Sequence, residues 1–115
     1  MGSGKGYENN IAFLDINPLS EGHTLVIPKK EVDYLFDLED EDYTALNLFA
    51  KKVAKAIKKV TNKRIGTAVI GIEVPHAHIH LIPFVQMSEL NFANQKLSFT
   101  SEAFTATATK IREAL

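Results

Sequence analysis

The chain has 115 residues, of which 45% are hydrophobic and 23% charged, as in one ordinary globular domain. Its formal net charge of −1 argues against a nucleic-acid-binding protein that works by counterion release. It has no cysteine, which excludes disulfides and thiolate metal sites and predicts a reducing, cytoplasmic location. Its apolar runs are far shorter than the ~20 residues that span a bilayer, so no membrane partner is expected.

Residues 1–10 are expected to be a leader, either an engineered addition or the remnant of a truncated segment. The stretch Met1–Gly6 has no apolar core that could serve as a signal peptide. Residues 11–115 are expected to form a single domain.

Two strands are predicted near the start of this domain. The first covers residues 11–16, and the turn-forming residues 17–22 follow it as a loop. The second covers residues 23–27, a β-branched run that Pro28 ends because proline cannot donate to a strand ladder.

A long helix is predicted over residues 38–61. Asp37 is expected to cap it, with Asp40 as a capping-box partner, and acidic residues at its start and lysines at its end suit the helix dipole. One apolar stripe is expected to face the core, made of Leu46, Phe49, Ala50, Val53, Ile57 and Val60. The lysines between them are interpreted as a solvated face rather than a membrane-binding or nucleic-acid-binding face, because the net charge is balanced.

The second half of the chain predicts two more strands, at residues 64–70 and 76–84, separated by a turn at residues 73–75. Thr100 is expected to cap a final helix that runs to Leu115, although its threonines alternate with alanine as they would in a strand. The predicted fold class is therefore α+β: an antiparallel sheet of about four to five strands with one long helix and a C-terminal helix.

Three of the four histidines alternate along the predicted strand 76–84. Because successive side chains of a strand point to opposite faces, His76, His78 and His80 are expected to share one face at spacings of about 6–7 Å. The opposite face is expected to pack in the core through Ala77, Ile79 and Leu81. Neighbouring imidazoles disfavour each other's protonation, so a cluster of this kind is difficult to explain by structure alone. His23, on another strand, could join it.

Two chemistries use such a cluster. A neutral imidazole can attack phosphorus while neighbouring donors hold the developing charge. Alternatively, three histidines can bind a metal ion, with His23 or Glu73 as a further ligand. The outer two histidines of a straight strand lie ~13 Å apart, which argues against one metal ion held by all three.

These residues resemble a known family. The run His-Ala-His-Ile-His-Leu-Ile at residues 76–82 is similar to the signature of the histidine triad (HIT) superfamily, and residues 12–18 and 22–29 resemble its first conserved block. The resemblance covers roughly residues 11–84. It implies an α+β fold, a homodimer whose sheets join, and hydrolysis of purine nucleotide conjugates such as phosphoramidates or dinucleoside polyphosphates, with no cofactor.

The resemblance also implies roles for individual residues. The middle histidine, His78, corresponds to the nucleophile that carries a nucleotidyl intermediate. His80 and His23 correspond to residues that approach the phosphate, and His76 to the one that orients the nucleophile, partly through its backbone carbonyl. Asp15 corresponds to the acid that holds the ribose hydroxyls. Two apolar residues correspond to the lining of the base pocket, Phe13 and Ile16, although Phe13 could equally pack in the core.

The sequence departs from the family at both ends of the site. Only a short segment precedes residue 11, so the base pocket is expected to be more open than usual. Glu73 stands where relatives have a leaving-group residue, and a glutamate there favours an amine leaving group over a polyphosphate. Val74, next to it, is a further candidate for substrate binding. A solvated turn glutamate is an equal alternative. After the triad come Pro83 and Phe84, and the chain has no tryptophan, as in short bacterial members.

The sequence thus predicts a nucleotide hydrolase or phosphoramidase. Two alternatives stay open at this point. One is a nucleotide-binding protein that has lost catalysis, and the other is a histidine-based metal-binding module.

Overall fold

The computed structural model describes residues 9–70 and 74–115. Four strands, two α-helices and two short 3-10 helices follow one another along the chain: β1 (Asn10–Leu14), β2 (Thr24–Pro28), η1 (Leu35–Asp37), α1 (Asp40–Thr61), β3 (Arg64–Ala68), β4 (Ile79–Phe84), η2 (Met87–Leu90) and α2 (Ser101–Ala114).

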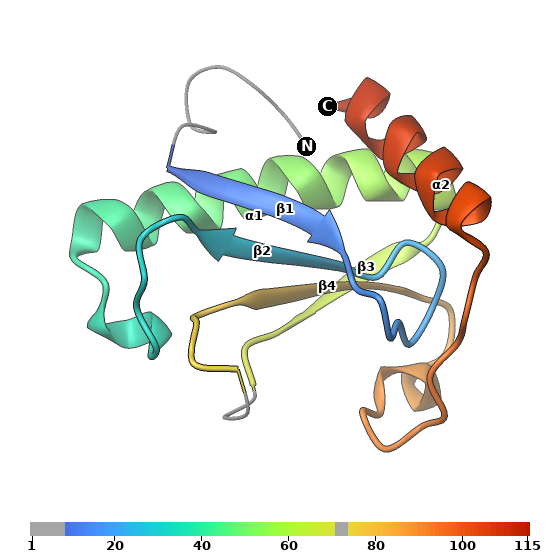
Figure 1. The fold of residues 1–115 in the computed structure, drawn as a ribbon, viewed down its shortest axis with the longest axis horizontal. Coiled ribbons are helices and arrows are strands. Elements are labelled where there is room, and N and C mark those ends of the chain that lie inside the picture. The colour runs from blue at the N-terminus through green and yellow to red at the C-terminus, as the bar shows by residue number, and fades with distance from the viewer. Residues whose placement is uncertain (1–8, 71–73) are drawn as a thin grey trace.

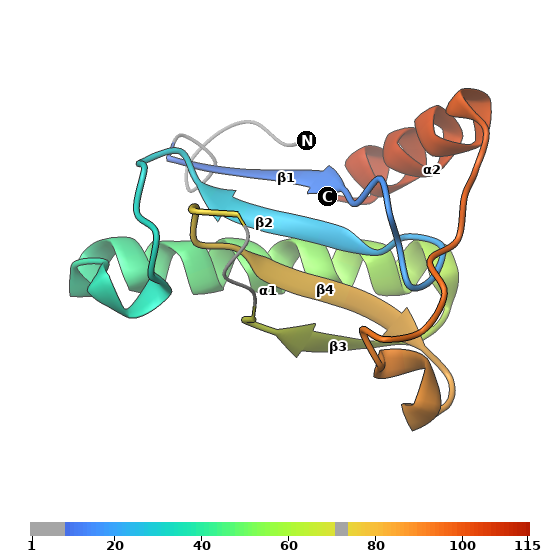
Figure 2. The same cartoon turned by 60° about the horizontal axis from the view of Figure 1, so that its bottom comes forward.

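The strands form one sheet in the order β1-β2-β4-β3, and every neighbouring pair is antiparallel. Helix α1 lies across one face of this sheet, and α2 lies near α1 and the β1 edge (Figures 1 and 2). The predicted α+β class, with an antiparallel sheet, one long helix and a C-terminal helix, is confirmed. Among the described residues, no helix is long and apolar enough to cross a membrane.

The core lies between α1 and the sheet. The apolar stripe predicted for α1 is confirmed, since its members are buried apart from Val60, which is partly buried. From the sheet, Val26, Ile79 and Leu81 are buried beneath it. Because strand side chains alternate, the residues between these point away from α1, and we call that side the outer face of the sheet.

The start of α1 differs from the prediction. Asp37 belongs to η1 and does not cap α1; the N-cap is Glu39, which makes no side-chain capping bond, so the predicted capping box with Asp40 is wrong. The intervening Leu38 is extended and 8% exposed. Its burial against the core holds the backbone out of the helical conformation and delays the helix by two residues.

The strands are shorter than predicted at their site ends. β1 ends at Leu14, although Asp15 still donates its N–H to the His23 carbonyl at 2.9 Å. The Asp15 carboxylate then accepts the Asn17 N–H at 2.9 Å, and this side-chain turn leads the chain away from β2. β4 begins at Ile79 and not at residue 76, because Ala77 donates its N–H to the Val32 carbonyl in a loop. β3 ends at Ala68.

The C-terminal helix forms as predicted. Thr100 accepts the Ala103 N–H on its hydroxyl at 3.1 Å and so caps α2. Ile111 is fully buried against the core, which anchors the helix despite its threonines. Leu115 lies beyond the end of the helix and is exposed.

Candidate active site on the outer face of the sheet

One row of side chains crosses the outer face and leads to the histidines. The strand registers pair Phe13 with Leu25, Leu25 with His80, and His80 with Ala68. His80 is the one triad histidine that lies within β4; His76 and His78 precede the strand, so the predicted straight line of three histidines on one strand is wrong. The other face of this segment is as predicted, since Ala77, Ile79 and Leu81 are all buried.

His23 and His80 are joined by a hydrogen bond whose direction the backbone sets. The Leu19 N–H donates to Nδ1 of His23 at 3.0 Å, so that nitrogen must be the acceptor. The ring proton of neutral His23 is then on Nε2, which lies 3.0 Å from Nδ1 of His80 and donates to it. It follows that neutral His80 carries its own proton on Nε2 and can donate that proton to a substrate oxygen.

His78 has the opposite arrangement. Its Nδ1 lies 2.8 Å from the carbonyl oxygen of His76, and because a carbonyl only accepts, Nδ1 must carry the proton. Nε2 of neutral His78 therefore holds a free lone pair, as a nucleophile requires. His76 is held in turn by its own Nε2–H, which donates to the Pro28 carbonyl at 2.7 Å. This is the contact through which the resemblance predicts that His76 orients His78.

Three rings surround the imidazole of His80. Its centroid lies 5.0 Å from that of His78, 5.2 Å from that of His23 and 4.8 Å from that of Phe92. Burial, followed by the neighbouring His23 and His78, lowers the pKa of His80 to about 4, and burial also lowers the pKa of His23. Both are therefore neutral near pH 7, in the proton arrangement described above.

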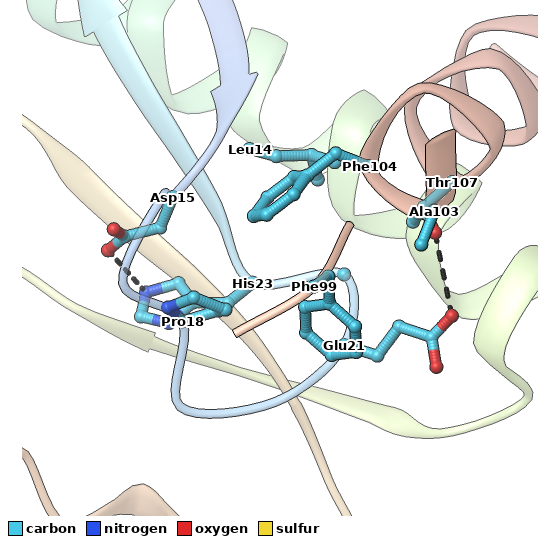
Figure 3. A pocket seen from close by; sticks show the side chains of 10 residues that line it. Leu14, Asp15, Pro18, Glu21, His23, Phe99, Ala103, Phe104 and Thr107 are labelled. Atoms are coloured by element: carbon cyan, nitrogen blue, oxygen red, sulfur yellow. Dashed lines mark hydrogen bonds and ion pairs between the residues drawn. The ribbon is translucent and has the colours of Figure 1, made fainter. Parts of the chain in front are cut away.

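Asp15 lies beside the pair formed by His23 and His80. One of its carboxylate oxygens is 3.6 Å from Nε2 of His23 (Figure 3). This negative charge partly opposes the effect of burial on the pKa of His23. Asp15 is thus brought beside the histidines, with its other oxygen occupied by the Asn17 N–H.

The two predicted base-pocket residues differ in how far their side chains are exposed. Phe13 is 41% exposed on the outer face, so it is not part of the core. Ile16 is 78% exposed in the loop after β1 and is not enclosed by its surroundings.

The residues predicted on the leaving-group side are only partly described. Glu73 lies outside the described residues. The side chain of Val74 is exposed, while its carbonyl accepts the His76 N–H at 2.8 Å. Val74 therefore contributes to the site by holding the backbone at His76.

Two side chains of the site were missed in the sequence. Leu25 stands between Phe13 and His80 in the row across the outer face. The alternation of side chains along the strand could have revealed Leu25, because it places this residue on the same face as His23. Phe92, which packs its ring against His80, lies in a segment without any periodicity, so no local pattern pointed to it.

The crevice next to His23 is too small to hold a nucleotide. It lies between Leu14, Phe99 and Phe104 and has a volume of about 10 Å³, which is room for about one water molecule (Figure 3). Across it, the Thr107 hydroxyl on α2 is 3.5 Å from the Glu21 carboxylate. We interpret this packing as support for the loop that carries Asp15 and His23.

Asp15, His23 and His80 also offer ligand atoms within 4.8 Å of one another, as a metal site would. The hydrogen bonding of His23 argues against it. A metal ion on Nε2 would move the ring proton to Nδ1, where it would face the Leu19 N–H, which is a donor only. Metal-bound histidines almost always donate their second N–H to an acceptor. These residues therefore fit a chain of hydrogen bonds better than a metal centre.

Comparisons with known proteins identify the family of this chain. The HIT domain model matches residues 7–87. An uncharacterized HIT-like protein of Borreliella burgdorferi is 36% identical over 111 residues, which is 87% of this chain and 80% of that protein. The adenosine 5′-monophosphoramidase of Saccharomyces cerevisiae is 45% identical over 74 residues, 63% of this chain but only 47% of the yeast protein.

Among solved structures, a HIT-like protein from Bartonella henselae superposes with a TM-score of 0.77 at 32% identity, covering 94% of this chain and 82% of that one. The family model thus matches the part of the chain that carries the histidines, and a solved structure matches the fold. The chain belongs to the HIT-domain family.

Proposed function

We propose that this protein hydrolyses nucleoside phosphoramidates or related nucleotidyl conjugates through a covalent nucleotidyl intermediate on His78. The observation that carries the proposal is the bond from Nδ1 of His78 to the His76 carbonyl, which leaves Nε2 free beside His80. The similarity to a yeast adenosine 5′-monophosphoramidase supports the phosphoramidate as the substrate class.

In the first step, Nε2 of His78 attacks the α-phosphorus and the bond from phosphorus to the leaving nitrogen breaks. The nitrogen leaves with the bonding electron pair and takes up a proton, for which Glu73 is the proposed donor. The Nε2–H of His80 donates to the phosphoryl oxygens, and His23 holds that donor in place by its own bond to Nδ1.

In the second step, water attacks the same phosphorus and the bond to His78 breaks. The electron pair returns to Nε2, and the water gives a proton to the Glu73 carboxylate left by the first step. The nucleoside monophosphate is then released. Water is the only co-reactant in this scheme, which needs no cofactor.

The nucleoside would lie on the β1 and β2 side of the histidines. Asp15 would accept hydrogen bonds from the ribose hydroxyls, since a carboxylate can bind both hydroxyls of a diol. Phe13, Ile16 and Leu25 would contact a purine base from the outer face, where Phe13 and Ile16 are already exposed.

A homodimer is the proposed assembly. Strand β3 forms one edge of the sheet and, within the described residues, pairs with no strand on its outer side. An open edge of this kind is a template for pairing with a second copy of the chain.

A catalytically impaired nucleotide-binding protein is the second candidate. The observation that favours it is the exposure of Ile16, 78%, which leaves the base side of the site open. Binding of AMP without turnover of any nucleotidyl conjugate would support this candidate against the first.

The substitution His78→Ala tests the proposal. It should lower turnover of an adenosine 5′-phosphoramidate by at least about 1,000-fold, as the loss of a covalent nucleophile does. The circular dichroism spectrum should not change, because His78 is outside the buried core. The control Val85→Ala removes an exposed side chain after β4 and should retain activity. Wild-type activity in His78→Ala would contradict the proposal.

A further inference from the structure

The segment that follows η2 returns to the histidines without regular structure. Residues 91–100 form neither a helix nor a strand, and a turn at residues 92–94 brings the ring of Phe92 to the site. The centroid of this ring lies 4.8 Å from that of His80 and 6.3 Å from that of His23, edge to face in both cases. Phe92 therefore covers both members of the hydrogen-bonded histidine pair.

Two carbonyl oxygens of this turn share one ammonium group. Lys96 donates from Nζ to the carbonyl of Phe92 and, at 3.1 Å, to the carbonyl of Asn94. An ammonium group has three donors, so a single side chain can hold both carbonyls at once. A segment outside helices and strands has no repeating backbone bonds, and side-chain bonds of this kind therefore decide where the Phe92 ring lies.

The turn is also anchored on either side of these bonds. Asn94 donates its N–H to the Asn91 carbonyl at 3.0 Å, which closes the turn. Leu97 donates its N–H to the Pro18 carbonyl at 2.9 Å and so joins the segment to the loop between β1 and β2. Lys96 lies between these two anchors, and its bonds span the part of the segment that carries the ring.

The charge of Lys96 acts on the histidine pair in the same sense as the ring. The pKa of His23 is lowered by burial and, to a smaller extent, by the positive charge of Lys96, whereas Asp15 opposes both. The pKa of His80 is lowered first by burial and then by His23 and His78. Cover and charge together therefore favour the neutral pair, in which His80 presents its Nε2–H.

We propose that Lys96 is a positioning residue for the reaction, which holds the Phe92 ring over His80 and so keeps that imidazole neutral and able to donate to the substrate. The proposal rests on the proposed function for the role of His80. It adds a residue that acts through Phe92 and does not touch the substrate.

The consequence of losing this support follows from the ring protons. If the turn loosened, water would reach His80 and favour its protonated form. Nδ1 of a protonated His80 carries a hydrogen, which would face the Nε2–H of His23. Two donors cannot bond to each other, so the connection that holds His80 in place would break.

An NMR titration of the ring protons of His80 and His23 tests the proposal. Lys96 is exposed, so its replacement should not disturb the core. His80 should titrate near pH 4 in the wild-type protein and about one pH unit higher in Lys96→Met, which keeps the length of the side chain but loses its donors and charge. Lys96→Arg should stay close to the wild-type value, because a guanidinium group keeps both. Lys110→Met, which removes an exposed lysine on α2, is the control and should change neither titration.

A double variant shows whether Lys96 acts through Phe92. In a Phe92→Ala background the ring is absent, so Lys96→Met should change the titration of His80 far less than it does in the wild-type background. His23 should still respond, because the charge of Lys96 acts on it directly. An unchanged titration of His80 in Lys96→Met, or an equal change in both backgrounds, would overturn the proposal.

Turnover measurements separate this proposal from the proposed function. Lys96→Met should lower kcat for adenosine 5′-phosphoramidate by about tenfold, because small displacements of a reacting group are costly, and Lys96→Arg should recover most of the loss. Wild-type kcat in Lys96→Met would overturn the proposal. A wild-type protein that turned over no nucleotidyl conjugate would count against the proposed function alone, because the titrations need no substrate.

Discussion

His80 shows how neighbouring rings can fix the proton arrangement of a site. The alternating histidines led us to expect that they would oppose one another's protonation, and the pKa of His80 is indeed lowered, with burial as the larger cause. The motif could not reveal that cause, because it depends on His23 and Phe92, which are distant in the sequence.

Stability should depend on pH through His80. Its pKa is about 4 in the folded protein and 6.5 ordinarily, so between these values the unfolded chain binds a proton that the folded chain does not. The free energy of unfolding should therefore fall as the pH is lowered from about 6.5 to about 4, and His23 should add to the same trend. Urea unfolding at several pH values measures it.

His80→Asn is the matched variant, because the asparagine oxygen can still accept from His23. Its stability should fall less steeply over the same pH range. A slope equal to that of the wild-type protein would show that His80 is not the group responsible.

Phe92→Ala should raise the pKa of His80 toward its ordinary value. The ring of Phe92 covers that imidazole, and burial is the largest cause of the lowered pKa. An NMR titration of the His80 ring proton gives the measurement, with Phe36→Ala as an aromatic control away from His80. The role of Phe92 would be disproved by an unchanged titration in Phe92→Ala.

At the residue scale, the sequence motif pointed to the candidate nucleophile, His78, but not to all the groups that set the ring protons of the histidines around it. The carbonyl of His76 is two residues from His78, so its role follows from the local backbone. The Leu19 N–H that sets the proton of His23 depends on the fold of the loop at residues 17–22. Backbone donors of this kind carry no residue-type signal.

At the scale of elements, helix α1 was predicted best where it contacts the sheet. Its apolar stripe repeats at the helical period, and the helix ends at Thr61 as predicted. Its beginning was wrong because tertiary burial of Leu38, and not a capping residue, decides where the chain turns into a helix. The predicted ends of the strands were also wrong, because side-chain turns and loop contacts decide where the ladders end.

Two leucines of α1 test this account of the core. Leu46 is fully buried and Leu48, two residues later, is 57% exposed. Leu46→Ala should lower the free energy of unfolding by about 2–5 kcal/mol, whereas Leu48→Ala should change it by less than about 0.5 kcal/mol. Denaturant unfolding of both variants measures this difference, and similar losses would mean that the packing of α1 on the sheet is not as described.

At the scale of the whole molecule, the class of fold followed from the sequence, but the order of the strands did not. The order β1-β2-β4-β3 places His23 and His80, 57 residues apart in the chain, within hydrogen-bonding distance. It also leaves β3 at an edge. No local pattern carries this information, because strand order depends on which ladders form between distant segments.

The proposed dimer is tested at this scale. Multi-angle light scattering should give a mass of about twice the 12.8 kDa of one chain, because the open edge of β3 can pair with a second copy. A mass of one chain at micromolar concentration would contradict the dimer, while leaving the chemistry of a single site unaffected.

The covalent role of His78 is the central claim, and mass spectrometry tests it most directly. The protein is mixed with an AMP–lysine phosphoramidate, quenched within the first turnovers and digested. The account predicts an adenylyl group on the peptide that contains His78, absent from the His78→Ala variant. Turnover of the substrate with no adduct on this peptide, or an adduct on another histidine, would contradict it.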